Sequence, residues 1–198
     1  MTIEGIDRSG KTTQARLLCM ALGEDALAVR EPGGTPVGER IRDLLKDPQL
    51  AIEPETEALL FAAARAQLVA QVIRPALEAG RVVVSDRFLD SSLAYQGAAR
   101  GLGVEEVAGI NRWATGGLVP DLTILLELDP AAAAARAGEA DRFEDEGLAL
   151  QREVGAAYER LAAADPSRWR RVNADRPPEE IHADVVAAVE AARSGAPA

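Results

Sequence analysis

The sequence is poor in residue types on which many enzymes depend. Its 198 residues include one cysteine, one histidine and only two lysines among 22 basic side chains. A single Cys19 cannot form a disulfide within the chain, which favours a reducing, cytoplasmic setting. Cys19 and His182 together cannot supply the ligands of a Cys/His zinc site. A hydrolase that depends on histidine would have to use His182, which lies in a charged helical pattern.

Positive charge is also scarce. The formal net charge is −10 and the pI is about 4.7, so we expect neither nucleic acid nor an anionic membrane as a partner. The first 20 residues contain Glu4, Asp7 and Arg8, and no uninterrupted apolar run reaches 18 residues. We therefore expect no signal peptide and no membrane span. The length and the 47% share of hydrophobic residues indicate one globular domain, 1–198.

What the chain does contain is a regular alternation of short apolar runs and longer helical stretches. The expected strands are 2–4, 26–29, 82–85, 122–128 and 169–172. The expected helices are 11–22, 37–46, 55–79, 104–115, 147–164 and 179–193. Continuous apolar strands that alternate with helices are typical of a parallel sheet covered by helices, so the predicted fold class is α/β.

A phosphate-binding motif follows the first expected strand. Residues 5–12, GIDRSGKT, fit the pattern G-x-x-x-x-G-K-[ST] in full and lead into an expected helix. The glycines let successive backbone N–H groups face a phosphate, and the helix adds its positive N-terminal end. In such a loop the lysine, here Lys11, reaches the β- and γ-phosphates, and the Thr12 hydroxyl can bind Mg²⁺.

The surroundings of this motif narrow the class of protein. A GTPase would need a guanine-reading N-K-x-D segment, and the nearest match, NRWA at 111–114, lacks it. The chain is also short for a large motor ATPase. A small kinase has a suitable size, and it needs a second phosphate site opposite the first, with arginines that hold the acceptor.

Two residue pairs are candidates for this acceptor side. Asp86 and Arg87 end the third expected strand, where the ligand crevice of a parallel sheet lies. There Asp86 could hold Mg²⁺ and Arg87 could clamp a phosphate, although such a pair can also be a plain surface ion pair. Phe61 and Arg65 share one helix face, where they could stack on a base and bond its edge. Phe61 alone would equally suit a core position.

Two further segments are polar or rich in turn-forming residues. In the segment SSLAYQG at 91–97, Gln96 has donors and an acceptor that suit a pyrimidine edge, whereas Ser91 taken alone fits a helix cap better. The loop EPGGT at 31–35 precedes a helix in which Arg40 and Arg42 point to different faces. We expect at most one of these two arginines to face the crevice.

Together these segments resemble the thymidylate kinases, P-loop enzymes that phosphorylate dTMP with ATP. The resemblance extends to about Asp175 and rests on the joint order of segments 5–13, 31–35, 38–45, 60–65, 86–97, 120–129 and 172–175. It implies a three-layer P-loop kinase fold whose five-stranded parallel sheet has the order 2-3-1-4-5. It also implies conversion of dTMP to dTDP in dTTP biosynthesis, Mg²⁺ as cofactor, a homodimer, and a short mobile lid at about 136–146.

The resemblance further implies roles for individual residues. Phe61 would stack on thymine, Arg65 and Ser92 would bond its edge, and Tyr95 would pack where a 2′-hydroxyl would crowd. The implied dTMP-binding residues are Asp7, Glu31, Arg42, Phe61, Arg65, Arg87, Ser92, Tyr95 and Gln96. The implied ATP-binding residues are Gly5, Ile6, Asp7, Arg8, Ser9, Gly10, Lys11, Thr12, Thr13, Arg136 and Asn173. The implied metal ligands are Thr12 and Asp86.

A transition-state arginine is also implied, and the family carries it either in the P-loop or in the lid. This chain has Arg8 in the P-loop and both Arg136 and Arg142 in the lid. We expect Arg8 to act on the γ-phosphate and Arg142 to close over ATP, while Arg136 can also be a solvated charge. The predicted catalytic residues are Arg8, Lys11, Asp86, Arg87 and Arg142.

Two other functions fit parts of the sequence. One is a kinase for another nucleoside monophosphate or for a deoxynucleoside. The other is a P-loop nucleotide sensor that transfers no phosphate, against which the acceptor-side residues argue.

Overall fold

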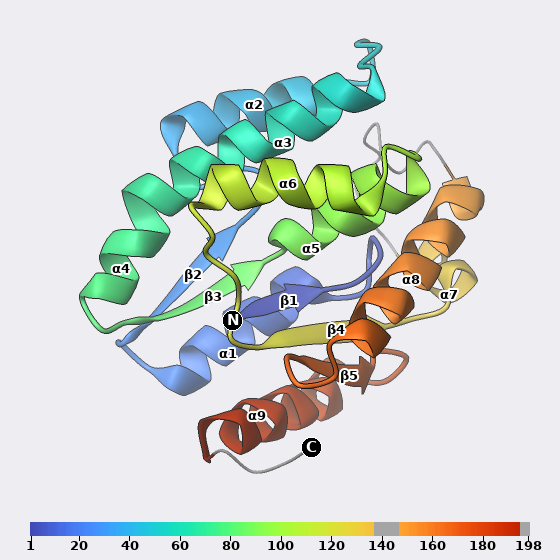
Figure 1. Ribbon diagram of the computed structural model, residues 1–198. Coiled ribbons are helices and arrows are strands. Elements are labelled where there is room, and N and C mark those ends of the chain that lie inside the picture. The colour runs from blue at the N-terminus through green and yellow to red at the C-terminus, as the bar shows by residue number, and fades with distance from the viewer. Residues whose placement is uncertain (137–146, 195–198) are drawn as a thin grey trace.

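A five-stranded parallel sheet runs through the centre of the computed structural model (Figure 1). The structure describes residues 1–136 and 147–194. The strands are β1 (Thr2–Glu4), β2 (Ala26–Arg30), β3 (Val82–Asp86), β4 (Thr123–Glu127) and β5 (Trp169–Asn173). Their order is β2-β3-β1-β4-β5, and every neighbouring pair is parallel. The predicted fold class and strand order are confirmed.

Helices precede and follow the strands largely where the pattern placed them. The α-helices are α1 (Lys11–Leu22), α2 (Pro36–Lys46), α3 (Pro54–Leu68), α4 (Arg74–Glu78), α5 (Leu89–Ser92), α6 (Val104–Thr115), α7 (Pro130–Ala134), α8 (Gly147–Ala164) and α9 (Pro178–Ser194). Two π-helical segments, η1 (Val69–Ile73) and η2 (Leu93–Ala99), continue α3 and α5.

The sequence pattern missed one detail and was wrong in another. The expected helix 55–79 is one helical run, Pro54–Glu78, but it contains the π-helical segment η1 just before Pro75. Proline has no N–H to donate and its ring crowds the preceding turn, which a wider π turn accommodates. Ser91 is not a helix cap either: it lies inside α5, whose N-cap position is Phe88.

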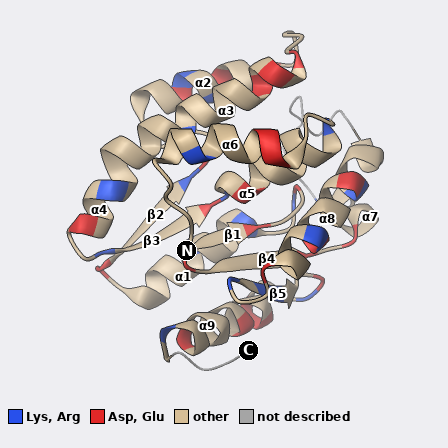
Figure 2. Cartoon of the chain, viewed as in Figure 1, with Lys and Arg blue, Asp and Glu red and all other residues tan. Residues whose placement is uncertain are grey.

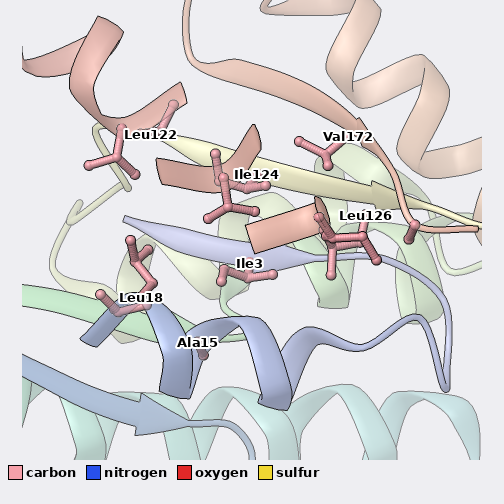
Figure 3. Packing of buried hydrophobic residues seen from close by; sticks show 12 residues of the cluster. Ile3, Ala15, Leu18, Leu122, Ile124, Leu126 and Val172 are labelled. Carbon is pink, nitrogen blue, oxygen red and sulfur yellow. The ribbon is translucent and has the colours of Figure 1, made fainter. Parts of the chain in front are cut away.

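Helices cover both faces of the sheet, and side-chain alternation along the strands divides the core accordingly. Ile3, Ile124 and Leu126 face α1 and α9, where they pack with Ala15, Leu18 and Val185 (Figure 3). Leu125 points the other way, into a cluster with Val154 and Tyr158 of α8. Val83 packs with Leu68 and Ile73 beneath α3 and η1. Because Ile3 faces α1, its neighbour Glu4 must face α5 and α8.

Charged residues of both signs are interspersed over the outer helices (Figure 2). Within the described residues, one helical run, Pro54–Glu78, is long and apolar enough to span a membrane by length and composition. Its most apolar window is 44% buried inside the fold, and α3 packs against both α2 and α6. A helix that packs within a protein core can have the same composition.

Candidate active site

The carboxyl ends of β1, β2 and β3 open into a cavity of about 450 Å³. Parallel sheets place ligand crevices at this edge, because loops from several strands converge there. The lining residues are Asp7, Arg8, Lys11, Thr12, Arg30, Glu31, Pro32, Arg42, Lys46, Phe61, Arg65, Asp86, Arg87, Ser91, Ser92, Tyr95 and Gln96. Every dTMP-binding residue that the sequence predicted is among them.

The P-loop joins β1 to α1 along one wall of this cavity. Gly5 has φ 144°, and a Cβ atom there would lie 2.6 Å from the backbone oxygen of Leu126, so only glycine fits. Lys11 is buried, and its Nζ donates to the backbone oxygen of Ile6 at 2.5 Å. Burial, reinforced by the nearby charge of Arg87, lowers the pKa of Lys11 to about 8.

Thr12 and Asp86 meet at the mouth of the P-loop. The Thr12 hydroxyl donates to Asp86 Oδ2 at 2.5 Å, although the two residues are 74 positions apart in the sequence. Both are hard oxygen donors of the kind that Mg²⁺ prefers. The described residues contain no group of three or more His, Cys, Asp or Glu side chains that could hold a metal ion.

Arg87 lies at the centre of the cavity floor, held on several sides. Its Nη1 donates to Gly5 O at 3.2 Å and to Ser91 Oγ at 3.0 Å. Its Nη2 donates to Asp7 Oδ1 at 2.5 Å and to the Tyr95 hydroxyl at 3.2 Å. The guanidinium carbon also lies 5.0 Å from the centre of the Tyr95 ring. These contacts orient a half-buried positive charge beside the P-loop.

Asp7 connects the P-loop to Arg87 and to α8. Burial raises the pKa of its carboxyl group, but the charges of Arg87 and Lys11 act more strongly in the other direction, so the pKa lies below its ordinary value. Gln151 of α8 binds Asp7 twice: Nε2 donates to Asp7 Oδ2 at 2.6 Å, and the Asp7 backbone N–H donates to Gln151 Oε1 at 3.0 Å.

Phe61 and Arg65 share a helix face as predicted, but their environments differ. Phe61 is half-buried and lines the cavity, whereas Arg65 is buried within a polar network. Arg65 donates to Glu31 Oε2 at 2.7 Å, Ser92 Oγ at 3.0 Å and Phe88 O at 3.1 Å, and also to Asn111. The second carboxylate oxygen of Glu31, Oε1, is buried with no hydrogen-bond partner among the described residues.

Gln96 is oriented by a carboxylate of α3. Its Nε2 donates to Glu57 Oε1 at 2.8 Å, and Arg100 donates to both oxygens of the same carboxylate. Gln96 and Glu57 are both buried. One of the two amide N–H groups of Gln96 is committed to Glu57, so the amide oxygen can accept from a ligand and the second N–H can donate to it.

One of the two arginines in α2 faces the cavity, as expected. The helix begins at Thr35, whose hydroxyl accepts from Gly38 N at 2.9 Å, with Pro36 in the first turn. This start places Arg42 on the cavity lining, where its Nη1 donates to Pro32 O at 2.9 Å. Arg40, two residues earlier, is exposed.

A second hollow of about 530 Å³ lies on the other side of the P-loop. Its lining comprises residues 8–14 together with Arg136, Arg176, Pro178 and Ile181, so it includes Thr13. Arg136 donates to Arg8 O at 3.2 Å and to Ala174 O at 2.6 Å, which ties it to the P-loop and to the segment after β5. Because Arg136 makes these backbone hydrogen bonds, it is not a solvated surface charge, which was the alternative interpretation of this residue.

One predicted ATP-binding residue, Asn173, does not line this hollow. Asn173 borders a separate hollow formed by the ends of β4 and β5 and by α8, and its Oδ1 accepts from the backbone N–H of Asp175. Arg142 and the rest of the expected lid beyond Arg136 lie outside the described residues.

Sequence reasoning missed several side chains of the site. Lys46 and Arg30 line the cavity, Gln151 binds Asp7, and Glu57 orients Gln96. Glu4 and Tyr158 lie behind Ser91.

For Lys46, the rarity of lysine was the one available signal. Gln151 and Glu57 sit in helices with no motif, and their partners are 144 and 39 positions away.

Comparison with known proteins places this geometry in a family. The sequence profile described as thymidylate kinase matches residues 3–185. A thymidylate kinase of Deinococcus radiodurans is 49% identical over 195 residues, covering 96% of this chain and 95% of that protein. A thymidylate kinase of Symbiobacterium thermophilum is 50% identical over 196 residues, covering 96% and 92%. A crystal structure of thymidylate kinase from Ehrlichia chaffeensis superposes with a TM-score of 0.81 at 28% identity, covering 96% of both chains.

Proposed function

We propose which spaces hold the substrates of this chain, which belongs to the thymidylate kinase family and transfers the γ-phosphoryl group of ATP to dTMP, giving dTDP and ADP. The cavity of about 450 Å³ takes dTMP, and the hollow of about 530 Å³ takes ATP. One observation carries this assignment: Arg8, Lys11 and Thr12 line both spaces. The phosphoryl group then has to pass only across the P-loop, between two sites that share its cationic side chains.

The base end of the acceptor site is formed by Phe61, Arg65, Ser92 and Gln96. Phe61 stacks on thymine, and the Gln96 amide oxygen accepts from a donor on the base edge. Arg65 bonds the base edge and at the same time fixes Ser92 and Glu31 through its own hydrogen bonds. Tyr95, buried against Arg87, packs against the deoxyribose and leaves no room for a 2′-hydroxyl.

The phosphate end of the acceptor site is formed by Arg87, Arg42 and Asp7. Arg87 and Arg42 bind the dTMP phosphate, as guanidinium groups suit phosphate oxygens well. Asp7 accepts from the sugar 3′-hydroxyl while it orients Arg87 from the other side. Glu31 orients neighbouring groups on this side of the cavity through its ion pair with Arg65.

The reaction is an in-line transfer without a covalent enzyme intermediate. The acceptor is already an anion, so no strong general base is required, which agrees with the scarcity of histidine. The main obstacle is repulsion between two phosphates. Lys11, Arg8, Arg42 and Arg87 reduce it by neutralising charge and fixing the geometry. Arg8 stabilises charge on the γ-phosphoryl group, whereas the role predicted for Arg142 falls on a residue outside the described ones.

Mg²⁺ suits the oxygen donors at the mouth of the P-loop. It commonly binds one or two protein oxygens, several waters and phosphate oxygens rather than a cage of side chains. Thr12 Oγ1 and Asp86 Oδ2, which are 2.5 Å apart, provide such a donor set. When bound, Mg²⁺ would neutralise phosphate charge beside Lys11.

The ATP side comprises the P-loop residues 5–13 and Arg136, and Asn173 joins them from the separate hollow that it borders at β4, β5 and α8. Arg136 supports the adenosine end while its hydrogen bonds to Arg8 O and Ala174 O keep it in place. The lid predicted at about 136–146 lies, beyond Arg136, outside the described residues and stays a prediction, as does a single kinase domain over 1–198.

The enzyme is a homodimer joined through α3 and α6. A groove between these helices is lined almost entirely by apolar and small residues: Leu59, Ala62, Ala63, Ala66, Gly109, Ile110, Trp113 and Ala114. Trp113 is 86% exposed and Leu59 56% exposed. Small residues let two helix pairs approach closely, and burial of a tryptophan adds a large apolar area. The expected setting is the cytoplasm, without a membrane or nucleic-acid partner.

Arg42 and Arg40 provide a matched test of the acceptor site. The substitution Arg42→Ala should raise the Kd for dTMP about tenfold or more, the scale of a lost charge-assisted contact, and leave ATP affinity unchanged. Arg40→Ala, two residues away on the exposed face, should change neither. Calorimetric titration of each variant with each nucleotide measures both. An Arg42 effect confined to ATP would contradict the assignment of the two spaces.

A further inference from the structure

Glu4 is a buried carboxylate to which the mechanism above gives no role. It ends β1, its exposed fraction is 0%, and it makes four hydrogen bonds. Its Oε1 accepts from Phe88 N at 2.7 Å and from Thr2 Oγ1 at 3.1 Å. Its Oε2 accepts from Ser91 Oγ at 2.6 Å and from the Tyr158 hydroxyl at 2.9 Å. These partners lie directly behind Arg87.

The first link from Glu4 to Arg87 runs through the two hydroxyls. Ser91 and Tyr158 each have one hydroxyl proton, and both oxygens lie within hydrogen-bonding distance of Glu4 Oε2 and, at 2.8 Å, of each other. Their lone pairs are then available to Arg87 Nη1, which donates to Ser91 Oγ at 3.0 Å and to the Tyr158 hydroxyl at 3.4 Å. Nη1 is thereby anchored in the protein, while Nη2 reaches Asp7 and Tyr95 on the cavity lining.

The second link runs through the backbone. Arg87 has φ 69°, a left-handed conformation that is costly for a residue with a side chain and persists only where the surroundings fix it. The peptide N–H that follows it, Phe88 N, donates to Glu4 Oε1. On the other side, Arg87 N donates to Ile3 O at 3.1 Å and Ser85 Oγ donates to Arg87 O at 2.6 Å.

We propose that Glu4 is the positioning residue of the acceptor site, holding the backbone and the guanidinium of Arg87 in the orientation that receives the dTMP phosphate. The proposal rests on the proposed role of Arg87 in binding that phosphate. A carboxylate suits this position because it only accepts hydrogen bonds, and four donors converge on it. The substitution Glu4→Gln weakens one of the two links whichever way the amide faces. An NH₂ group toward Phe88 N removes the acceptor of that N–H, and one toward the hydroxyls takes up lone pairs that accept from Arg87 Nη1.

Titration of Glu4 provides a readout that a purely structural role would not. Burial and the charge of Asp90 raise the pKa of Glu4 to about 7. The charged or titratable groups that act on it are Arg87, Asp90, Tyr158 and Lys11, and Asp90 is paired with Arg168 at 2.6 Å. Below this pH the protonated carboxyl cannot accept from both hydroxyls. dTMP affinity should therefore rise as the pH increases through about 7, above the phosphate's own titration near 6.

The test is a double-mutant cycle on dTMP affinity, measured by calorimetry at pH 8 for Glu4→Gln, Arg87→Ala and the double variant. We expect Glu4→Gln to raise the Kd for dTMP about 10- to 100-fold, the usual scale for loss of a supporting contact, with ATP affinity unchanged. In the Arg87→Ala background the same substitution should add almost nothing, because its effect passes through Arg87. The proposal would be overturned if the two substitutions raised the Kd for dTMP by factors that multiply in the double variant. It would also be overturned if Glu4→Gln weakened ATP binding as much as dTMP binding.

Asp90→Asn is the matched control. It also removes a buried carboxylate on this side of the sheet, but Asp90 bonds Arg168 and Thr123 rather than the partners of Arg87. We expect a lower melting temperature but an unchanged Kd for dTMP at pH 8. In the wild type, dTMP affinity should show an inflection near pH 7, where Glu4 titrates. In Asp90→Asn this inflection should move to lower pH, because the Asp90 charge no longer raises the pKa of Glu4. In Glu4→Gln it should be absent. An inflection that survives in Glu4→Gln would contradict the proposal.

Two further arms keep the result interpretable. If Glu4→Gln does not fold, Ser91→Ala replaces it in the double-mutant cycle. This substitution removes one of the two hydroxyls that lie between Glu4 and Arg87. An unchanged Kd for dTMP in Arg87→Ala would refute the phosphate-binding role of Arg87 and the present proposal with it. A large effect of Arg87→Ala with none from Glu4→Gln and Ser91→Ala would refute only the positioning role.

Discussion

The Asp7 carboxylate and the Arg87 guanidinium meet at 2.5 Å although 80 positions separate them in the chain. Asp7 belongs to the P-loop and Arg87 directly follows β3, so the ion pair joins the proposed donor side of the site to the proposed acceptor side. Neither residue is free to move alone, because Gln151 holds Asp7 and the Ser91 hydroxyl holds Arg87. These hydrogen bonds connect the two proposed phosphate sites to one another.

Removal of the P-loop lysine should abolish most of the turnover. Lys11→Ala deletes the ammonium group that both spaces share, and we expect kcat to fall by roughly 10²-fold or more, the scale of a lost electrostatic contact in a transition state. Steady-state kinetics with ATP and dTMP measure the change. Arg16→Ala is the control, since Arg16 lies in the same helix and is exposed. Near-normal turnover in Lys11→Ala would refute the P-loop assignment.

ATP binding should weaken above pH 8. The pKa of Lys11 is lowered to about 8, so this group loses its charge as the pH rises through that value. Bound phosphates favour the ammonium form and raise its pKa, so binding near pH 8 to 9 should take up protons. Calorimetry in buffers of different ionisation enthalpy measures the uptake. Lys11→Arg, which stays charged, should show none; equal uptake in that variant would assign the proton to another group.

The Phe61 ring should contribute to dTMP affinity but not to ATP affinity. We expect Phe61→Ala to weaken dTMP binding by about 1–3 kcal/mol, by analogy with base–aromatic stacking elsewhere. Glu55→Ala, an exposed change near the start of the same helix, is the control and should have no effect. Titration with each nucleotide decides the point: unchanged dTMP affinity in Phe61→Ala would mean that the ring only fills space.

A charge placed in the α3–α6 groove should separate the proposed dimer. Trp113→Lys puts an ammonium group at the most exposed apolar position of the groove, and we expect a monomer by analytical ultracentrifugation. Met20→Lys also replaces a large exposed apolar side chain, 68% accessible on α1, and should remain a dimer. A wild-type monomer, or a dimer that survives Trp113→Lys, would contradict the proposed interface.

Local patterns sufficed to predict the sheet, the P-loop and the strand-end pair Asp86–Arg87. Each of these is encoded by a few consecutive residues: an apolar run, a glycine spacing, or a polar pair after a strand. The π-helical segment η1 was not predicted because the periodicity continues through Pro75, and only the backbone responds to the missing N–H.

Side-chain networks could not be predicted in the same way. Phe61 and Arg65 were correctly placed on one helix face, yet nothing local shows that Arg65 is bonded to Glu31, Ser92 and Asn111 from three other segments. Glu4 looked like the end of a strand. Its role depends on Ser91 and Tyr158, 87 and 154 positions away. The sequence thus predicted the residues that line the cavity better than the residues that hold those side chains in place.

The central claim is that the cavity beside the P-loop selects dTMP and that Lys11 and its neighbouring arginines carry the γ-phosphoryl group to it. The most direct measurement is turnover with ATP and Mg²⁺ against a panel of acceptors, namely dTMP, dCMP, AMP, GMP and thymidine, with both nucleotide products followed. We predict equal formation of ADP and dTDP with dTMP, and little product with the others. Turnover with dCMP, AMP, GMP or thymidine but not with dTMP, or ADP formed without a phosphorylated acceptor, would contradict it.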